Sequence, residues 1–512
     1  MKKTLLVILA SLLLFTAACS DSGGGTAGDT TTGGTTAAAA TTAATTAATT
    51  TTATTAAPAI IPTDIPPVTI DLIAEGYPLD NEYHEESDYP YLSVGRILFV
   101  EEVNRYYFFV GYYLMYADAQ TMETAFLCNK EGCLHNESET KEEKMACEAF
   151  FYNSYGGELF TENGRLYFTH NPEDRSSFSL SSLTLSGEDL REEFRLDMDH
   201  SSSRPGGYIF HRGQLYYTWL KIDDAKNYTA ELWTYSLDKS TQEHRLLYQS
   251  QNTRNGFTPL VLQCAYGHHL YLREYIQLLE EYTAEHNGNA SSRRLEHCVE
   301  LILDLTTGEW TVTEMPDGYT YDSIEILDGK VLSKFISMDS IRAEADIWKT
   351  NLESEQQVEF PEPEYIMYVY NPATGQSEEL DEYPTDYSFW EYRFDEKYGY
   401  RYEHVKPDFQ ESMLYICDLN GQSIAEVPFS NIYGYPVEID GTLVDVDISF
   451  AFCTMLLQPN NKMVLHTVEI VETEKEGYFR ETYYYIDLAD MQGSEIEAHK
   501  FFECDSADYS VD

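Results

Sequence analysis

A glycine-containing turn followed by a short run of Leu, Tyr and Phe recurs along most of the chain. Runs of this length, rich in aromatic and branched residues, are typical of β-strands, and a glycine before them marks a turn. The unit predicts a turn and then a strand at six places: Gly95–Phe99, Gly164–Phe168, Gly213–Tyr217, Gly267–Tyr271, Gly329–Leu332 and Gly441–Leu443.

A second recurring unit follows most of the first ones and reverses their order, with an apolar strand leading into a polar turn. Asp or Asn near a Thr-Gly or Asn-Gly pair suits a tight hairpin, because these residues tolerate positive φ or bond their own backbone. This unit occurs at Leu183–Gly187, Leu232–Asp238, Leu301–Gly308, Tyr368–Gly375, Leu414–Gly421 and Tyr484–Leu488.

The spacing of the units predicts an all-β fold of the β-propeller class. Successive first units lie about 43 to 69 residues apart if a degenerate one at Tyr398–Tyr400 is included, which is the length of one four-stranded blade. No long uninterrupted amphipathic helix is evident. We expect about seven blades, with six or eight as alternatives, and a stack of β-sandwich domains as the competing architecture.

A propeller must also close its ring, usually by adding an N-terminal strand to its last blade. Val68–Ile73 follows Pro66-Pro67 and has the composition of a strand. We expect this segment to pair with the C-terminal strands.

The first nineteen residues indicate export and lipid attachment. Lys2 and Lys3 precede an apolar core, Leu5–Phe15, that is too short to span a bilayer. Residues 16–19, Thr-Ala-Ala-Cys, resemble a lipobox, although Thr16 stands where that pattern prefers Leu. The resemblance implies that residues 1–18 are a lipoprotein signal peptide and that Cys19 is diacylated, which places the chain on the extracytoplasmic face of the cell membrane. A plain secretory signal is the alternative.

Residues 19–57 consist almost entirely of Cys19 and then Ser, Gly, Thr and Ala, with no aromatic or large aliphatic side chain. Such a segment cannot bury enough apolar surface to fold. We therefore expect a disordered tether over 19–57 and a single propeller domain over 58–512.

Charge and composition limit the partners. The formal net charge of −53 argues against nucleic acid and anionic lipid headgroups as direct ligands, because both would be repelled. Aromatic residues make up 14% of the chain, whereas disordered acidic segments are poor in them, so the acidic body is expected to fold. The membrane, reached through the lipid anchor, and an extracellular glycan, peptide or protein remain as partners.

Eight cysteines follow Cys19, and three of them lie close together with a histidine. Cys128, Cys133, His135 and Cys147 offer three thiolates and one imidazole, which is a donor set for tetrahedral zinc. An exterior location equally permits a disulfide within the segment, or thiols that remain unpaired. In each case we expect this segment to staple a loop rather than to catalyse.

The chain resembles the uncharacterised β-propeller-like lipoproteins of Gram-positive, clostridia-type bacteria. The resemblance rests on the lipobox, the tether, the repeated Gly-x-Leu-Tyr-Tyr units, and the segments Leu127–His135 and Ala146–Ala149. It implies a fold and a location, and no chemistry.

Other candidate sites are weaker. His268 and His269 are neighbours at a strand start, where adjacent side chains point to opposite faces, so the pair is not expected to bind one ion. Residues 275–296 predict an extended hairpin of the fourth blade. No catalytic residue can be chosen from the sequence, since 86 acidic residues offer too many carboxylate pairs. A non-catalytic binding module is the favoured hypothesis; a carbohydrate-active or other hydrolytic enzyme with an axial site is the alternative.

Overall fold

The computed structural model describes the part of the chain that follows residue 60. The described residues are 61–81, 97–135, 140–151, 159–172, 176–199, 203–237, 243–286, 289–313, 315–327, 330–354, 358, 360, 361, 363–371, 376–379, 392–394, 398–403, 411–418, 422–432, 437–439, 442–444, 447–457, 462–472, 477–488 and 496–505. The signal peptide, Cys19 and the tether therefore lie outside the described residues.

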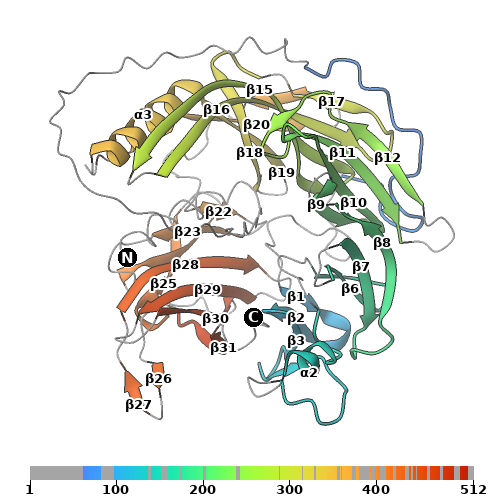
Figure 1. Cartoon of the computed structure of the whole chain (residues 1–512), viewed down its shortest axis with the longest axis vertical. Coiled ribbons are helices and arrows are strands. Elements are labelled where there is room, and N and C mark those ends of the chain that lie inside the picture. Colours follow the sequence, from blue (N-terminus) through green and yellow to red (C-terminus); the bar gives the residue numbers. More distant parts are fainter. Residues whose placement is uncertain are drawn as a thin grey trace, which may run out of the picture. The chain divides into compact units, whose positions relative to one another are not determined.

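The described residues form seven sheets built on four strands that follow one another in the chain and pair antiparallel, together with one separate two-stranded sheet (Figure 1). The first sheet comprises β1 (Ile97–Val100), β2 (Arg105–Val110), β3 (Tyr113–Asp118) and β4 (Thr124–Phe126), with a 3-10 turn at Glu101–Val103. The second comprises β5 (Leu159–Glu162), β6 (Arg165–His170), β7 (Ser177–Thr184) and β8 (Arg191–Asp197). The third comprises β9 (Ser203–His211), β10 (Gln214–Ile222), β11 (Asn227–Ser236) and β12 (His244–Gln249), with a short fifth strand, β13 (Arg254–Asn255), on β11.

The remaining sheets follow the same plan. The fourth comprises β14 (Leu260–Tyr266), β15 (His269–His286), β16 (Asn289–Asp304) and β17 (Trp310–Val312). The fifth comprises β18 (Tyr319–Leu327), β19 (Lys330–Ser337), β20 (Tyr365–Asn371) and β21 (Gln376–Glu379). The sixth comprises β22 (Tyr392–Phe394), β23 (Gly399–Glu403), β24 (Met413–Cys417) and β25 (Ser423–Pro428), followed by a 3-10 turn at Phe429–Asn431. The seventh comprises β28 (Asp447–Leu457), β29 (Lys462–Glu472), β30 (Gly477–Asp487) and β31 (His499–Asp505). A separate two-stranded sheet pairs β26 (Val437–Ile439) with β27 (Thr442–Val444).

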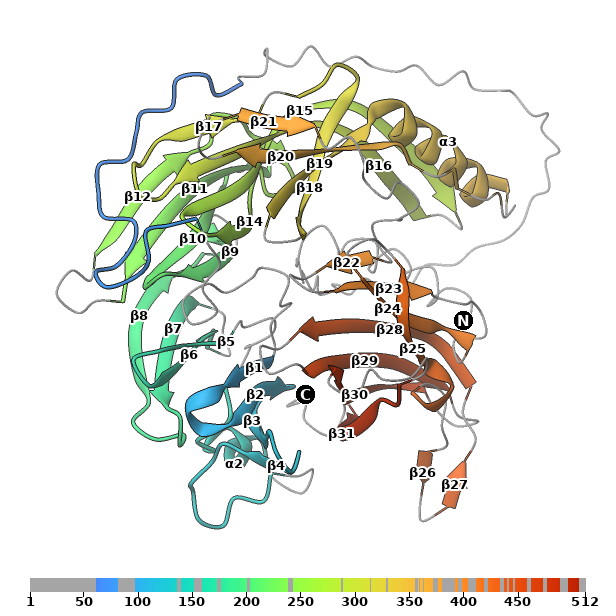
Figure 2. The ribbon, with the colours of Figure 1, turned by 180° about the vertical axis from the view of Figure 1, so that it is seen from behind.

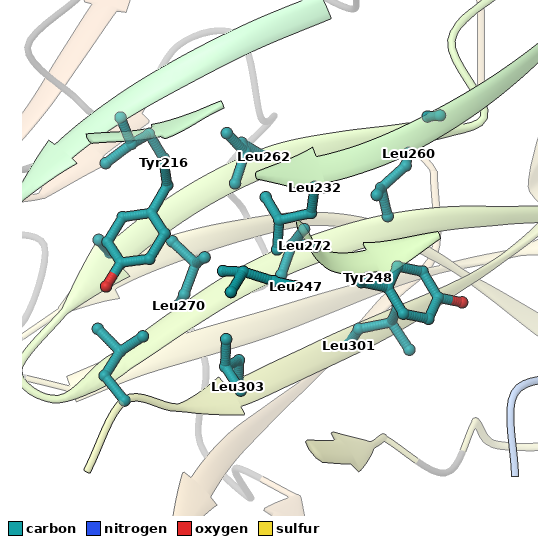
Figure 3. Close-up of a cluster of buried hydrophobic side chains, with 14 of the residues drawn as sticks. Tyr216, Leu232, Leu247, Tyr248, Leu260, Leu262, Leu270, Leu272, Leu301 and Leu303 are labelled. Atoms are coloured by element: carbon teal, nitrogen blue, oxygen red, sulfur yellow. The ribbon is translucent and has the colours of Figure 1, made fainter. Parts of the chain in front are cut away.

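Each sheet buries its apolar faces against its neighbours. The third and fourth sheets share the largest cluster, in which leucines of β11, β14, β15 and β16 meet Tyr216 and Tyr248 (Figure 3). Similar clusters join the first sheet to the second, the second to the third, the fourth to the fifth and the sixth to the seventh, and β18 contacts β22 between the fifth and sixth.

The seventh sheet also packs on the first. Phe108 lies 5.3 Å from Tyr483 between ring centroids, and the Tyr483 hydroxyl donates to the Phe109 carbonyl oxygen at 3.3 Å. Seven sheets of four consecutive strands, each packed on the next and the last on the first, make a β-propeller of seven blades. The expected fold class and blade number are confirmed.

The two sequence units correspond to different strands of a blade. The first unit marks the second strand in blades two to five, and the degenerate unit at Tyr398–Tyr400 introduces β23 in blade six. The second unit ends the third strand in blades two to seven. Two first units deviate: the one at Gly95 leads into β1, and the one at Gly441 lies in the extra two-stranded sheet.

The expected pairing of Val68–Ile73 with the C-terminal strands is wrong. This segment belongs to residues 61–81, which we call the N-terminal strap, and the strap crosses the third and fourth blades. Val68 N donates to Gly308 O at 2.8 Å, Ala74 N donates to Arg212 O at 3.0 Å, and the Tyr216 hydroxyl donates to Leu72 O. The seventh blade already has four strands of its own, because β31 occupies its last position. The apolar strap residues instead cover the cluster between blades three and four.

Replacing Gly308 by alanine is expected to displace the strap. A Cβ at Gly308 would lie 2.0 Å from Val68 O, whereas one at Gly256, which has the same φ of 74°, would meet nothing within 4 Å. Both substitutions carry the cost of placing a Cβ at positive φ, about 1–2 kcal/mol. Gly308→Ala should cost about 1–3 kcal/mol more because of the clash. Urea unfolding of both variants measures the difference, and equal losses would contradict the contact.

The fourth and fifth blades carry an elaboration that lengthens them. Strands β15 and β16, of 18 and 16 residues, run far past β14 and β17, which confirms the extended hairpin. Helix α3 (Met338–Ser354), inserted between β19 and β20, packs on this hairpin (Figure 2). The helix was not expected from the sequence.

Candidate metal centre

The cysteine segment connects the last strand of the first blade to the second blade. Cys128 follows β4, and the chain then passes through the short helix α2 (Lys141–Met145) before it reaches Cys147. Thr140 begins α2 with a capping box, since its side chain accepts from Glu143 N while the Glu143 carboxylate accepts from Thr140 N. The returning chain pairs with the start of β3, because Leu114 N donates to Ala149 O at 2.8 Å. Backbone bonds thus hold both ends of the segment.

The structure brings the four residues of the expected site together. The ligand atoms of Cys128, Cys133, His135 and Cys147 all lie within 4.8 Å of one another. Cys147 is buried and the other three are half-buried. Among the described cysteines no disulfide is formed. Of the three alternatives that the sequence leaves open, this geometry suits a metal site.

Aromatic side chains hold His135 in place. Its ring stacks on Phe126 at 4.3 Å between centroids with an interplanar angle of 8°, and Tyr113 meets its edge at 6.1 Å. Residue 135 has a φ of 53°, a left-handed conformation that turns the side chain toward the cysteines. The imidazole is thus oriented by the first blade itself.

Burial raises the pKa of the Cys147 thiol far above its ordinary value, and the neighbouring Cys133 and Cys128 raise it further. One backbone bond opposes them, because Ala149 N donates to Cys147 Sγ at 3.4 Å. Three thiols packed together without a cation disfavour thiolates, whereas a bound metal ion deprotonates its thiol ligands outright. Metal binding at this cluster would therefore have to displace the Cys147 proton.

The segment also contacts the second blade. The Asn129 amide donates to Ser186 O at 3.0 Å, and the Tyr107 hydroxyl of β2 donates to Leu185 O at 2.6 Å. A Cβ at Gly187 would lie 2.9 Å from Leu127 Cγ, so the β7–β8 turn fits closely against the residue that precedes Cys128. A clamp on this segment would therefore stiffen the junction between blades one and two.

A second group of possible ligands differs from the sequence interpretation. The ligand atoms of His268, His269 and Asp304 lie within 4.8 Å of one another, and the two imidazole rings are 4.1 Å apart between centroids. Alternation of side chains does not apply, because His268 lies in the turn after β14 and only His269 begins β15. His269 is 1% exposed, and burial lowers its pKa to about 3, so its ring is neutral.

The other cysteines and the hairpin acids have structural surroundings. Cys264, Cys298 and Cys417 are buried in strands, while the side chains of Cys453 and Cys504 lie outside the description. Glu280 accepts from Arg342 Nε at 2.8 Å, and Glu281 from Arg294 Nε at 3.1 Å, so both brace the hairpin.

Two buried carboxylates were missed in the sequence. Glu274 accepts from the Tyr248 hydroxyl at 2.5 Å, and Glu300 accepts from Thr313 Oγ1 at 2.6 Å and Ser333 Oγ at 2.7 Å. Both carboxylates have raised pKa values, to about 7 for Glu300, because burial penalises the charged form. Their only signal in the sequence is a glutamate within an apolar strand.

No family model and no curated protein sequence matches the chain. Solved structures that resemble it include an oligogalacturonate lyase in complex with manganese, 9% identical over 77% of this chain and 90% of that one, with a TM-score of 0.39. The β-propeller domain of the trilobed protease from Pyrococcus furiosus is 8% identical over 81% and 91%, with a TM-score of 0.34. TolB from Acinetobacter baumannii is 12% identical over 79% and 80%, with a TM-score of 0.26. Within the described residues, neither helix is long and apolar enough to cross a bilayer.

Proposed function

We propose that this protein is a lipid-anchored extracytoplasmic β-propeller that binds an extracellular ligand without catalysing its conversion. Acylation of Cys19 would attach the chain to the cell membrane, and the Ala/Thr-rich residues that follow would tether the propeller. Two acyl chains give durable attachment where one is marginal. The net charge of −53 favours a neutral or cationic ligand over a phosphate-rich one.

The observation that carries the binding proposal is a braced extension of two blades that presents an exposed aromatic side chain. Arg293 of the hairpin pairs with Glu344 of α3, and its guanidinium lies 5.5 Å from the Trp348 ring centroid and 5.6 Å from that of Phe360. Asn351 fixes the approach to Phe360 by two 2.8 Å hydrogen bonds with the backbone of Val358. Phe360 is 49% exposed.

A fixed aromatic surface of this kind suits a neutral glycan. Aromatic rings offer a large contact area with few rotatable bonds, so little conformational entropy is lost when a sugar stacks on them. The surrounding ion pairs, Arg293–Glu344 and Arg342–Glu280, hold the hairpin and helix together before any ligand arrives. Preorganisation of this kind lowers the cost of binding.

A glycan array, followed by titration of the best ligand, tests this function. We expect saturable binding that Phe360→Ala weakens about tenfold, the loss of one stacking contact of about 1.4 kcal/mol. Ile424→Ala is the matched control, because it removes a similarly exposed apolar side chain, 42%, from β25 of the sixth blade. Turnover of the glycan, or equal binding by the two variants, would count against the proposal. Labelling with an alkyne fatty acid, lost in Cys19→Ser, checks the anchor.

We further propose that Cys128, Cys133, His135 and Cys147 bind structural zinc. Three thiolates and one imidazole complete a tetrahedron, and catalytic zinc sites instead keep a position open for water or substrate. The supporting observation is that all four ligand atoms already lie within 4.8 Å of one another. The ion would clamp the connection between the first two blades.

A further inference from the structure

A second cluster of potential ligands lies where the N-terminal strap crosses the fourth blade. His268 and His269 occupy the turn and first residue between β14 and β15, and Asp304 ends the neighbouring strand β16. The two strands pair in register here, with His269 opposite Asp304. The strap covers this turn so closely that a Cβ at Gly267 would lie 2.4 Å from Asn81 Oδ1.

The strap orients one of the two imidazoles. His269 Nδ1 lies 3.0 Å from Asn81 Oδ1, and because an amide oxygen only accepts, Nδ1 carries the proton. The lone pair of this ring is therefore on Nε2. A histidine that donates its second ring N–H to an oxygen in this way is the usual arrangement around a bound metal.

The carboxylate is oriented as well. Asp304 Oδ1 accepts from Thr306 N at 2.8 Å, Thr306 Oγ1 at 2.7 Å and Thr307 N at 3.1 Å. Three donors on one oxygen hold this carboxylate in a fixed orientation. Its other oxygen, Oδ2, lies 4.0 Å from His268 Nε2. That separation is too long for a hydrogen bond, and it suits an ion about 2 Å from each atom.

His268 presents its Nε2 toward the carboxylate, 4.0 Å from Asp304 Oδ2. The other ring nitrogen, Nδ1, is buried and has no hydrogen-bond partner among the described residues. Arg212, a cation that acts electrostatically on His269, is held by the strap, since its Nη1 donates to Pro78 O at 2.8 Å and Asp80 O at 2.9 Å.

We propose that His268, His269 and Asp304 bind a divalent transition-metal ion that holds the strap against the fourth blade. Two imidazoles and one carboxylate suit zinc and its neighbours in the first transition series, and leave a coordination position open. The ion would act through Asn81, which bonds the ring of a ligand and belongs to the strap. This site is separate from the cysteine centre and differs from it in having no sulfur donor.

Cobalt distinguishes the two centres because thiolate ligands give an intense charge-transfer band that nitrogen and oxygen ligands lack. Full-length protein purified without chelator is stripped, loaded with Zn²⁺ or Co²⁺ and analysed for metal content. We expect two ions per wild-type chain. His268→Ala and His268→Gln should each lose one ion and keep the thiolate band.

His297→Gln is the matched control, because His297 is a half-buried histidine of the same sheet outside the cluster. Hydrogen exchange of residues 65–81 gives an independent readout: zinc should slow exchange at least threefold in wild type and in His297→Gln, and have no such effect in the His268 variants. Circular dichroism identifies variants that do not fold, and His268→Gln preserves the size of the side chain. A full complement of metal in a folded His268 variant, or strap exchange indifferent to zinc in wild type, overturns the proposal.

Discussion

Replacing Cys147 by serine is expected to abolish the stabilisation that the proposed zinc ion would give through the cysteine cluster. At a thousandfold excess of zinc over the dissociation constant, a site that forms only in the folded chain contributes about 4 kcal/mol. Serine removes one of four ligands at the most buried position of the cluster, where its hydroxyl does not replace a thiolate. Thermal unfolding with added zinc or with chelator measures the increment.

Cys298→Ser separates the loss of metal from the loss of packing. Cys298 is buried in β16, 8% exposed, and lies outside the cysteine cluster. Its replacement should lower stability equally with zinc and with chelator, whereas Cys147→Ser should remove the part of the zinc-dependent difference that comes from the cysteine cluster and leave the part that comes from the His268 site. Mass spectrometry of alkylated, unreduced protein tests the alternative. A disulfide among Cys128, Cys133 and Cys147 would contradict the zinc proposal.

Glu300→Gln is expected to raise the free energy of unfolding at pH 8 and to change it little near pH 4. Burial raises the pKa of Glu300 in the folded chain to about 7, against an ordinary value of 4.5, while hydrogen bonds from Thr313 and Ser333 act in the other direction. Below the pKa that Glu300 has in the unfolded chain, the carboxyl is protonated in both states and does not lower the free energy of unfolding. As the pH rises from 4.5 through 7, stability is lost, by about 3 kcal/mol for a difference of about 2.5 units.

Glutamine removes this loss because it stays neutral at every pH. In urea unfolding at pH 4.5, 6 and 8, the free energy of unfolding of Glu300→Gln should increase relative to that of wild type as the pH rises. Glu188→Gln, at an exposed turn, corrects for the change in net charge and should follow wild type at each pH. A Glu300→Gln variant that runs parallel to wild type across this range would mean that the carboxylate is ionised and paired in the folded chain.

Features that depend on neighbours in sequence were predicted well. The turns at Gly213 and Gly267 have positive φ, and each leads directly into the second strand of its blade, because a tight hairpin is decided by a few adjacent residues. The cysteine cluster was found for the same reason, since a short loop brings Cys128, Cys133 and His135 together. Whether the cluster binds a metal or forms a disulfide depends also on Cys147, which follows α2 in the chain and is not part of that short loop.

Features that depend on distant contacts were not predicted. Val68–Ile73 has the composition of a strand, but its partners are Gly308, Arg212 and Tyr216, far away in the sequence. Composition indicates that such a segment is buried and says nothing of which surface it covers. Helix α3 was missed because a single amphipathic helix is hard to see among so many strand signals.

The histidine pair shows how a local rule fails at an element boundary. His268 and His269 were assigned to opposite faces of a strand, and the rule requires both to lie within that strand. The strand begins only at His269, so the turn brings the two rings to within 4.1 Å. Glu300 was overlooked because the side chains that donate hydrogen bonds to it, Thr313 and Ser333, belong to two other strand regions.

The path of the strap determines where a mechanical load would enter the propeller. Tension applied at residue 61 would pass through Val68, Leu72 and Ala74 into the third and fourth blades, where the largest apolar cluster resists it. The seam between the first and seventh blades has no shared strand and depends on side chains such as Phe108 and Tyr483. A load on the N-terminal strap would therefore enter the ring through blades three and four and not at the seam between the first and seventh blades.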